Sequence, residues 1–147
     1  SQQWVADVAR RADRPYEVLR KERTGDRSVN LSVPNDPSIL QNTPVILDDI
    51  ASSGKTMVQA IERLQTIGAR LPVCVIIHAV FAGQAYQDML AAGAARIVTT
   101  DSIPHHSNGI GLAAKISKAV RELIKKPDPS AFVRRSTSAI AEHGFEP

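Results

Sequence analysis

One stretch of sequence decides the fold of this chain: Val45-Ile46-Leu47-Asp48-Asp49-Ile50-Ala51-Ser52-Ser53-Gly54-Lys55-Thr56. An apolar run ends in two adjacent carboxylates, a loop of small residues follows, and an amphipathic pattern begins at Met57. A turn from strand to helix brings carboxylates, exposed backbone N–H groups and the positive end of a helix dipole together. The stretch therefore predicts a site for a phosphorylated sugar.

The apolar periodicity on the C-terminal side of this stretch predicts an alternation of strands and helices. We expect strands at 45–48, 73–80 and 96–100, the first two buried, and helices at 57–67, 83–92 and 110–124. Such an alternation is typical of a doubly wound α/β fold, with a mainly parallel sheet and helices on both faces. Ligands of such sheets bind at the carboxyl ends of the strands. Asp48-Asp49 lies at one such end, and Thr99-Thr100-Asp101, at another, could border the same pocket.

The N-terminal part of the sequence fits this rhythm less well. A helix is expected at 4–12 and short strands at 16–20 and 29–33, around a charged run at 20–27. The long segment from Lys21 to Thr43 interrupts the alternation, and we expect a functional lid or a segment without order in the absence of ligand. Because a strand normally precedes the first helix of such a domain, we expect the chain to be a fragment lacking it. The alternative explanation for a sequence that begins with Ser1 rather than Met is that a tag was removed.

Composition limits the class of protein. The chain has 147 residues, 43% of them hydrophobic, and a formal net charge of +3, which fit one ordinary globular domain. Cys74 is the single cysteine, so no disulfide framework exists and a reducing cytoplasm is expected. No apolar run is long enough to cross a bilayer. The mild positive charge suits anionic small molecules, and neither a nucleic-acid partner nor a membrane partner is expected.

The stretch at 45–56 resembles the 5-phosphoribosyl 1-diphosphate (PRPP) loop of the type I phosphoribosyltransferase fold. In that family a strand ends in two acidic residues and continues into a phosphate loop of small residues. The resemblance implies that Asp48 and Asp49 face the ribose hydroxyls and hold a Mg²⁺ ion. It implies that the 5-phosphate is held by Ser52, Ser53, Gly54, Lys55 and Thr56.

Three further segments make the sequence similar to the ribose-phosphate diphosphokinases, or PRPP synthases. They are Ile77-His78-Ala79-Val80-Phe81-Ala82-Gly83, Ile97-Val98-Thr99-Thr100-Asp101-Ser102-Ile103-Pro104, and Lys21-Glu22-Arg23. The first two resemble strand-end signatures of that family, and the third resembles its catalytic Lys-x-Arg flexible loop. They occur in the family order between about residues 1 and 124. The match covers only the C-terminal half of such an enzyme.

This resemblance implies transfer of the diphosphate of ATP to ribose 5-phosphate, which gives PRPP and AMP with Mg²⁺ as cofactor. Lys21 and Arg23 would be the catalytic residues, closing over the β-phosphate. Residues 1–125 would form the phosphoribosyltransferase-like domain and residues 126–147 a tail. The missing N-terminal half, or a homologous subunit, would supply most of the ATP site, and a homo-oligomer is expected.

The sequence departs from the family pattern at two positions of the phosphate loop. Ser53 stands where the family has Thr, which keeps a hydroxyl. Lys55 replaces a small residue and adds a cation, which could strengthen phosphate binding or occlude the pocket. The sequence Gly54-Lys55-Thr56 is not part of a P-loop, since that motif needs Gly where Asp49 stands.

Each candidate residue also has a purely structural interpretation. Asp48-Asp49 could be a surface turn, Ser52 or Ser53 could be an N-cap, and the charge run around Lys21 could be a solvated loop. For His78 we favour a structural role, and His105-His106 lacks a third ligand at the spacing of a zinc site.

Two other functions compete with the diphosphokinase. A phosphoribosyltransferase that consumes PRPP would share the loop, although no segment clearly supplies a base-binding hood. A regulatory subunit associated with PRPP synthase would keep the fold and lack the chemistry.

Overall fold

A computed structural model of the chain describes residues 2–19, 21–24, 28–32 and 37–125. The chain divides into two compact units, residues 1–111 and residues 112–147. The first unit carries the central sheet, and the second carries one helix, α4 (Ala113–Ile124). The expected boundary between a domain at 1–125 and a tail remains a prediction, and the tail lies outside the described residues.

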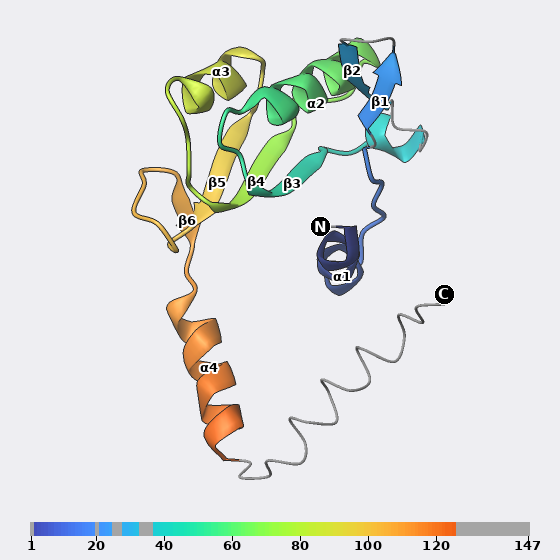
Figure 1. The fold of residues 1–147 in the computed structure, drawn as a ribbon. Helices are drawn as coiled ribbons and strands as arrows, with labels where there is room; N and C mark the ends of the chain where they lie inside the picture. The colour runs from blue at the N-terminus through green and yellow to red at the C-terminus, as the bar shows by residue number, and fades with distance from the viewer. Residues whose placement is uncertain (1, 20, 25–27, 33–36, 126–147) are drawn as a thin grey trace, which may run out of the picture. The chain divides into compact units, whose positions relative to one another are not determined.

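The centre of the first unit is a four-stranded sheet in the order β3-β4-β5-β6 (Figure 1). These strands span Val45–Ile50, Val73–His78, Arg96–Thr100 and Asn108–Ile110. All three neighbouring pairs are parallel, and the register places Asp48 opposite Ile76 and Ile76 opposite Thr99. The expected α/β fold with a parallel sheet is therefore confirmed.

Helices α2 (Lys55–Thr66) and α3 (Ala85–Ala91) lie together on one face of this sheet (Figure 1). The buried residues of α2 recur at helical spacing, which is why the sequence pattern predicted this helix correctly. They are Met57, Ala60, Ile61 and Leu64. Met57 and Ile61 of this set form one core with Met89 of α3, Cys74 and Ile76 of β4, and Ile97 of β5. This core fixes the turn between β3 and α2, where the predicted site lies.

The strand expected at 16–20 is wrong for the residues that the structure describes, since residues 16–19 have no regular structure. A strand needs a partner for its backbone groups, and none pairs with this segment among the described residues. The charged run instead provides β1 (Lys21–Thr24), which pairs antiparallel with β2 (Ser28–Leu31). The expected strand at 29–33 thus begins one residue earlier, and residue 33 lies outside the described part.

The segment from Lys21 to Thr43 includes regular elements among its described residues, and the expectation that it is a lid or lacks order without ligand stays a prediction. Besides the β1–β2 pair it contains a short 3₁₀ helix, η1 (Pro37–Leu40). The first helix of the unit, α1 (Gln2–Arg11), lies where the apolar spacing predicted a helix. The sequence of β1, Lys21-Glu22-Arg23-Thr24, has no apolar residue, and hydropathy patterning therefore did not find this strand.

Strand β3 is not the buried strand that its apolar run predicted. It is the edge of the described sheet, and Val45 and Ile50 remain 57% and 46% exposed. The strand also continues two residues beyond Asp48, so both acidic residues lie within it rather than after it. An apolar run alone does not distinguish an edge strand from a central one.

The remaining differences concern the ends of elements. Strand β4 ends at His78, α3 begins at Ala85, and Ile110, which was expected in the last helix, belongs to the unpredicted strand β6. The apolar residues of α4 are exposed: Ile116, Val120, Leu123 and Ile124. Within the part of the chain that the structure describes, no helix combines the length and hydropathy needed to cross a membrane.

Candidate functional site

The turn from β3 to α2 forms an open pocket of about 200 Å³. It is lined by Asp48, Ile50 and residues 51–57. Every residue predicted to hold the 5-phosphate therefore lines one pocket. The pocket lies at the carboxyl ends of the parallel strands, which is the edge where ligands of such sheets bind.

Gly54 determines the shape of this turn. It occupies the position before the first helical residue of α2, with φ of 70° in the left-handed region that favours glycine. A Cβ atom at this position would lie 3.1 Å from Cβ of Ala85 and 3.2 Å from its carbonyl oxygen. Glycine is thus required both for the backbone conformation and for the close approach of α3.

The N-terminus of α2 has no side-chain cap. Neither Ser52 nor Ser53 caps it, so the N-cap alternative for these serines is wrong. The first backbone hydrogen bond of the helix runs from Val58 N to Gly54 O at 2.9 Å. The N–H groups of the first turn have no partner within a helix and are suited to bind an anion. These donors and the exposed serine hydroxyls face the same pocket as Asp48.

The two acidic residues point to opposite faces of the sheet. Asp48 pairs in register with Ile76, whose side chain is buried in the core on the α2 side. Side chains alternate along a strand, so Asp49 projects from the other face. Asp48 lines the pocket, half-buried, whereas Asp49 is exposed and does not line it. The structure thus places Asp48 in the pocket, and a role of Asp49 toward the same ligand stays a prediction.

The acidic pair is linked by local hydrogen bonds. The Asp49 N–H donates to Asp48 Oδ1 at 2.9 Å, and the Ile50 N–H donates to Asp49 Oδ1 at 3.0 Å. A hydrogen bond with the Asp48 side chain, and then the Ile50 N–H, lower the pKa of Asp49 below its ordinary value of 3.8. Asp49 is therefore a carboxylate at neutral pH.

Lys55 is the cation of the pocket. It is the first residue of α2, it is exposed, and it forms no ion pair with any residue that the structure describes. The pocket thus combines an ammonium group and helix N–H donors with the Asp48 carboxylate. Such a set of groups fits a ligand with an anionic end and a hydroxyl-bearing end.

Lys21 and Arg23 lie on β1, opposite Leu31 and Val29 of β2. Of the two strands in the β1–β2 pair, β2 contacts α2. The backbone arrangement of the Lys-x-Arg segment is therefore an antiparallel ribbon, and its catalytic role stays a prediction.

Thr99 and Thr100, which were considered as ribose contacts, are structural. Thr99 is fully buried and its hydroxyl lies 3.0 Å from that of Ser107, while the Thr100 hydroxyl donates to the Ile77 carbonyl at 2.5 Å. His78 is also satisfied, with Nδ1 2.9 Å from the Ser102 hydroxyl. As predicted, His78 has a structural role, and these groups join the ends of β4 and β5.

Sequence analysis missed the residues that brace the phosphate loop from behind. The Ala82 N–H donates to the Ser52 carbonyl at 2.8 Å, and Ala85 contacts Gly54. Ala82 belongs to the segment that joins β4 to α3, and Ala85 is the first residue of α3. Nothing in an alanine side chain marks such a role, since one contact is made by the backbone and the other depends on small size.

The Asp48 carboxylate could hold Mg²⁺. Hard carboxylate oxygens suit this ion, which is commonly bound by one or two protein carboxylates together with substrate phosphates. No group of three or more possible metal ligands occurs among the described residues. The donor set therefore fits an ion shared with a phosphorylated ligand rather than one enclosed by the protein.

Comparisons of the sequence place it in a family. The sequence profile of the phosphoribosyl transferase domain matches residues 1–125, and the chain therefore belongs to the phosphoribosyl transferase domain family.

The chain is also similar to proteins named ribose-phosphate pyrophosphokinase, a synonym of diphosphokinase. The chain is 33% identical over 99 residues to the ribose-phosphate pyrophosphokinase of Sulfurisphaera tokodaii, and the match covers 66% of this chain and 34% of the relative. The chain is 30% identical over 108 residues to the protein of this name from Methanopyrus kandleri, and the match covers 74% of this chain and 37% of the relative. The chain is 33% identical over 113 residues to the enzyme of this name from Sulfolobus acidocaldarius, and the match covers 74% of this chain and 38% of the relative. The matched region thus spans little more than a third of each of these relatives.

Proposed function

We propose that this chain carries the ribose 5-phosphate site and the catalytic loop of a ribose-phosphate diphosphokinase. The observation that carries the proposal is the pocket in which Asp48 faces the uncapped N-terminus of α2 across a loop of small residues. The similarity to ribose-phosphate pyrophosphokinases supports the choice of reaction. Among the activities of the phosphoribosyl transferase domain family, these relatives favour synthesis of PRPP over its consumption.

In this proposal the 5-phosphate binds at the N–H groups of the α2 first turn, the hydroxyls of Ser52, Ser53 and Thr56, and Lys55. The Asp48 carboxylate accepts hydrogen bonds from the ribose hydroxyls and orients the sugar. Asp49 lies at the rim, on the other face of β3, and contributes negative charge to a bound cation. Mg²⁺, when bound, would neutralise charge on the phosphates of the nucleotide.

The proposed reaction joins the 1-hydroxyl oxygen of ribose 5-phosphate to the β-phosphorus of ATP. The bond between the β-phosphorus and the oxygen bridging it to the α-phosphate breaks, AMP leaves with that oxygen, and the hydroxyl proton passes to solvent. Lys21 and Arg23 stabilise charge on the transferring group. One arginine of this kind contributes on the order of a thousandfold in rate.

We further propose that the ATP site is completed outside these 147 residues. The relatives are almost three times as long as the segments they share with this chain. A further domain or a homologous subunit of a cytoplasmic homo-oligomer would supply the remaining contacts. The chain alone would then bind ribose 5-phosphate and release little AMP.

The experiment that tests this function measures AMP release from ATP and ribose 5-phosphate with Mg²⁺, for this chain alone and for the complete oligomeric protein. We expect robust turnover only in the complete protein, with a loss on the order of a thousandfold in Arg23→Ala. The Arg10→Ala variant, in α1, is the control. Pyrophosphate release from PRPP and a nucleobase, without AMP formation from ATP, would establish the competing phosphoribosyltransferase activity. Unchanged turnover in Arg23→Ala would remove the catalytic role of the loop.

A further inference from the structure

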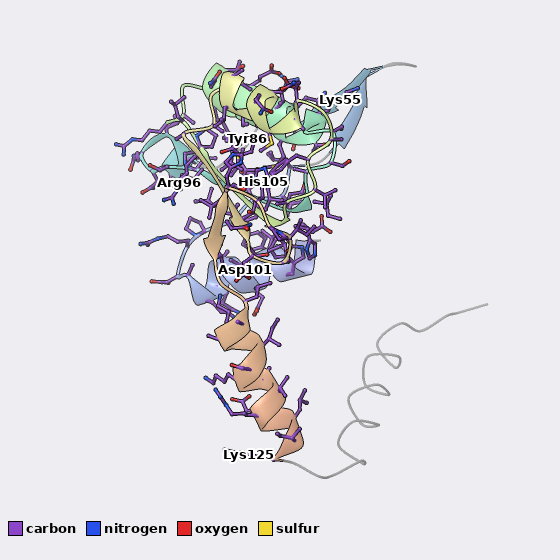
Figure 2. The ribbon with its side chains drawn as sticks, turned by 90° about the vertical axis from the view of Figure 1, so that its left-hand side faces the viewer. Lys55, Tyr86, Arg96, Asp101, His105 and Lys125 are labelled. Carbon is purple, nitrogen blue, oxygen red and sulfur yellow. The ribbon has the colours of Figure 1, made fainter. Side chains whose placement is uncertain are left out.

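Four rings pack together beside the phosphate loop and form a cluster that the proposed reaction does not use. The ring cluster consists of Phe81 after β4, Tyr86 of α3, and His105 and His106 of the loop between β5 and β6. His105 lies at its centre, with ring centroids 5.0 Å from Phe81, 5.3 Å from Tyr86 and 4.1 Å from His106. Figure 2 shows Tyr86 and His105 meeting above the end of the sheet.

Hydrogen bonds identify the protonation state of His105. The Ser107 backbone N–H donates to His105 Nδ1 at 3.2 Å, and the Ser107 hydroxyl lies 2.6 Å from the same nitrogen. Because a backbone N–H can only donate, Nδ1 must present a lone pair. The imidazole is therefore neutral, with its proton on Nε2. The buried Thr99 hydroxyl, 3.0 Å from that of Ser107, anchors this arrangement to β5.

Two contacts connect the ring cluster to the phosphate loop. Ala82, next to Phe81, donates its N–H to the Ser52 carbonyl at 2.8 Å. Ala85, next to Tyr86, is the residue whose Cβ a side chain at Gly54 would meet at 3.1 Å. Phe81 and Tyr86, two of the three rings in contact with His105, thus each adjoin a residue that touches the turn between β3 and α2. A shift of the imidazole would reach both ends of this turn.

We propose that His105 is a positioning residue for the phosphate loop, which it holds through Phe81 and Tyr86 only while its imidazole is neutral. Protonation places a hydrogen on Nδ1, which can then no longer accept from the Ser107 N–H and can bond only to the Ser107 hydroxyl, so the imidazole shifts. The rings of Phe81 and Tyr86, which also pack on each other, lose one of their packing partners, and the braces at Ala82 and Ala85 loosen. The proposal rests on the proposed function in one respect, since it takes ribose 5-phosphate as the ligand.

The surroundings of His105 set the direction of the pH dependence. Its contacts are the Phe81 ring from the segment after β4, the Tyr86 phenol from α3, and the His106 imidazole from its own loop. Burial, and then the charge of His106, lower the pKa of His105 below its ordinary value of 6.5. The braced state is thus fully present above about pH 6.5 and is lost as the pH falls through the lowered pKa.

The first test needs no ligand. The backbone amide resonances of Ser52 and Ala82 are followed by NMR in the 147-residue chain between about pH 8 and pH 5. In the wild type we expect both to titrate together with the His105 imidazole. In His105→Asn, the side-chain carbonyl can still accept from the Ser107 N–H and cannot be protonated, so both titrations should vanish. Amides that titrate identically in the two proteins would overturn the proposal.

Binding is measured next, as the dissociation constant of ribose 5-phosphate at about pH 7.5 and pH 5.5. The phosphate itself titrates near pH 6, which weakens binding equally in every variant. Beyond that common loss, the affinity of the wild type for ribose 5-phosphate should fall between about pH 7.5 and pH 5.5 by a factor roughly threefold to tenfold larger than that of His105→Asn. One unit of pKa corresponds to a tenfold change in equilibrium. The matched control is His78→Asn, which keeps an oxygen near Ser102 and should retain the full wild-type loss.

The outcomes separate this proposal from the proposed function. No binding at either pH, with amides that titrate in the wild type and not in His105→Asn, would remove the sugar-phosphate site and keep the positioning role. Equal losses of binding in all three proteins would overturn the positioning role alone. If His105→Asn fails to fold, His106→Gln replaces it. Removing that neighbouring charge should move the amide titrations to higher pH, and an unchanged midpoint would contradict the proposal.

Discussion

Gly54 and Ala85 approach so closely that a Cβ atom on Gly54 would lie 3.1 Å from Cβ of Ala85. The contact joins the start of α2 to the start of α3, and it lets the phosphate loop rest on the segment that follows β4. The loop is therefore shaped from two sides, by the left-handed backbone of Gly54 and by the small side chain behind it.

Replacing Gly54 should damage both stability and binding. Gly54→Ala forces a side chain into the left-handed region, which costs roughly 1–2 kcal/mol of unfolding free energy, and pushes against Ala85. Gly68→Ala is the matched control, because Gly68 has φ of 79° and nothing within 4 Å of an added Cβ. Thermal or urea unfolding should show a larger loss for Gly54→Ala, and only this variant should lose affinity for ribose 5-phosphate. Equal effects on binding would show that the loop tolerates the extra methyl group.

The opposite orientation of the two acidic residues predicts unequal roles. Asp48→Asn removes a charged acceptor from the pocket, and a hydrogen bond to a charged group contributes about 1.5–3 kcal/mol, so affinity for ribose 5-phosphate should fall roughly tenfold to a hundredfold. Asp49→Asn should change the affinity less than about threefold in the absence of Mg²⁺, since Asp49 projects from the other face. Isothermal calorimetry with and without Mg²⁺ measures the affinity of each variant for ribose 5-phosphate. An equal loss in both variants would show that the strand turns both carboxylates to the sugar in the bound state.

Lys55 should make binding of the sugar phosphate depend on salt. Lys55→Gln keeps most of the side chain and removes the charge, and we expect roughly threefold to tenfold weaker binding at low ionic strength. The difference should shrink as salt is added, because exposed charges are screened. Lys118→Gln, on α4, is the control for net charge. Tighter binding by Lys55→Gln would instead indicate that the lysine occludes the pocket.

Cys74 should be unreactive in the folded chain. Its side chain is fully buried on β4, and burial raises the pKa of the thiol to about 12. The reactive thiolate is therefore scarce near neutral pH. A chromogenic disulfide reagent should label the thiol only after denaturant is added. The rate of labelling thus reports opening of the core. Fast labelling of the native chain would contradict the packing of β4 against α2.

The sequence predicted the centre of this fold well, since α2 and β5 carry strong periodic patterns in Met57, Ile61 and Ile97. It did not predict that β3 is an edge strand, because position in a sheet depends on partners that lie far along the chain. It did not find β1, because the sequence of this strand, Lys21-Glu22-Arg23-Thr24, has no apolar residue.

The candidate site was predicted to a similar degree. The residues of the phosphate loop were found because one local turn brings them together. The direction of Asp49 was missed because β3 continues past Asp48, and strand ends are poorly marked in sequence. The braces at Ala82 and Ala85 and the position of His105 depend on contacts between separate turns, which no local pattern records.

The most direct test of the central claim is a calorimetric titration of the 147-residue chain with ribose 5-phosphate in the presence of Mg²⁺, compared with Asp48→Asn. We expect saturable binding of one ligand per chain, weakened at least roughly tenfold by the substitution. Binding that Asp48→Asn leaves unchanged, or no binding by a wild-type chain shown to be folded, would contradict the assignment of the pocket at residues 48–57 to a phosphorylated sugar.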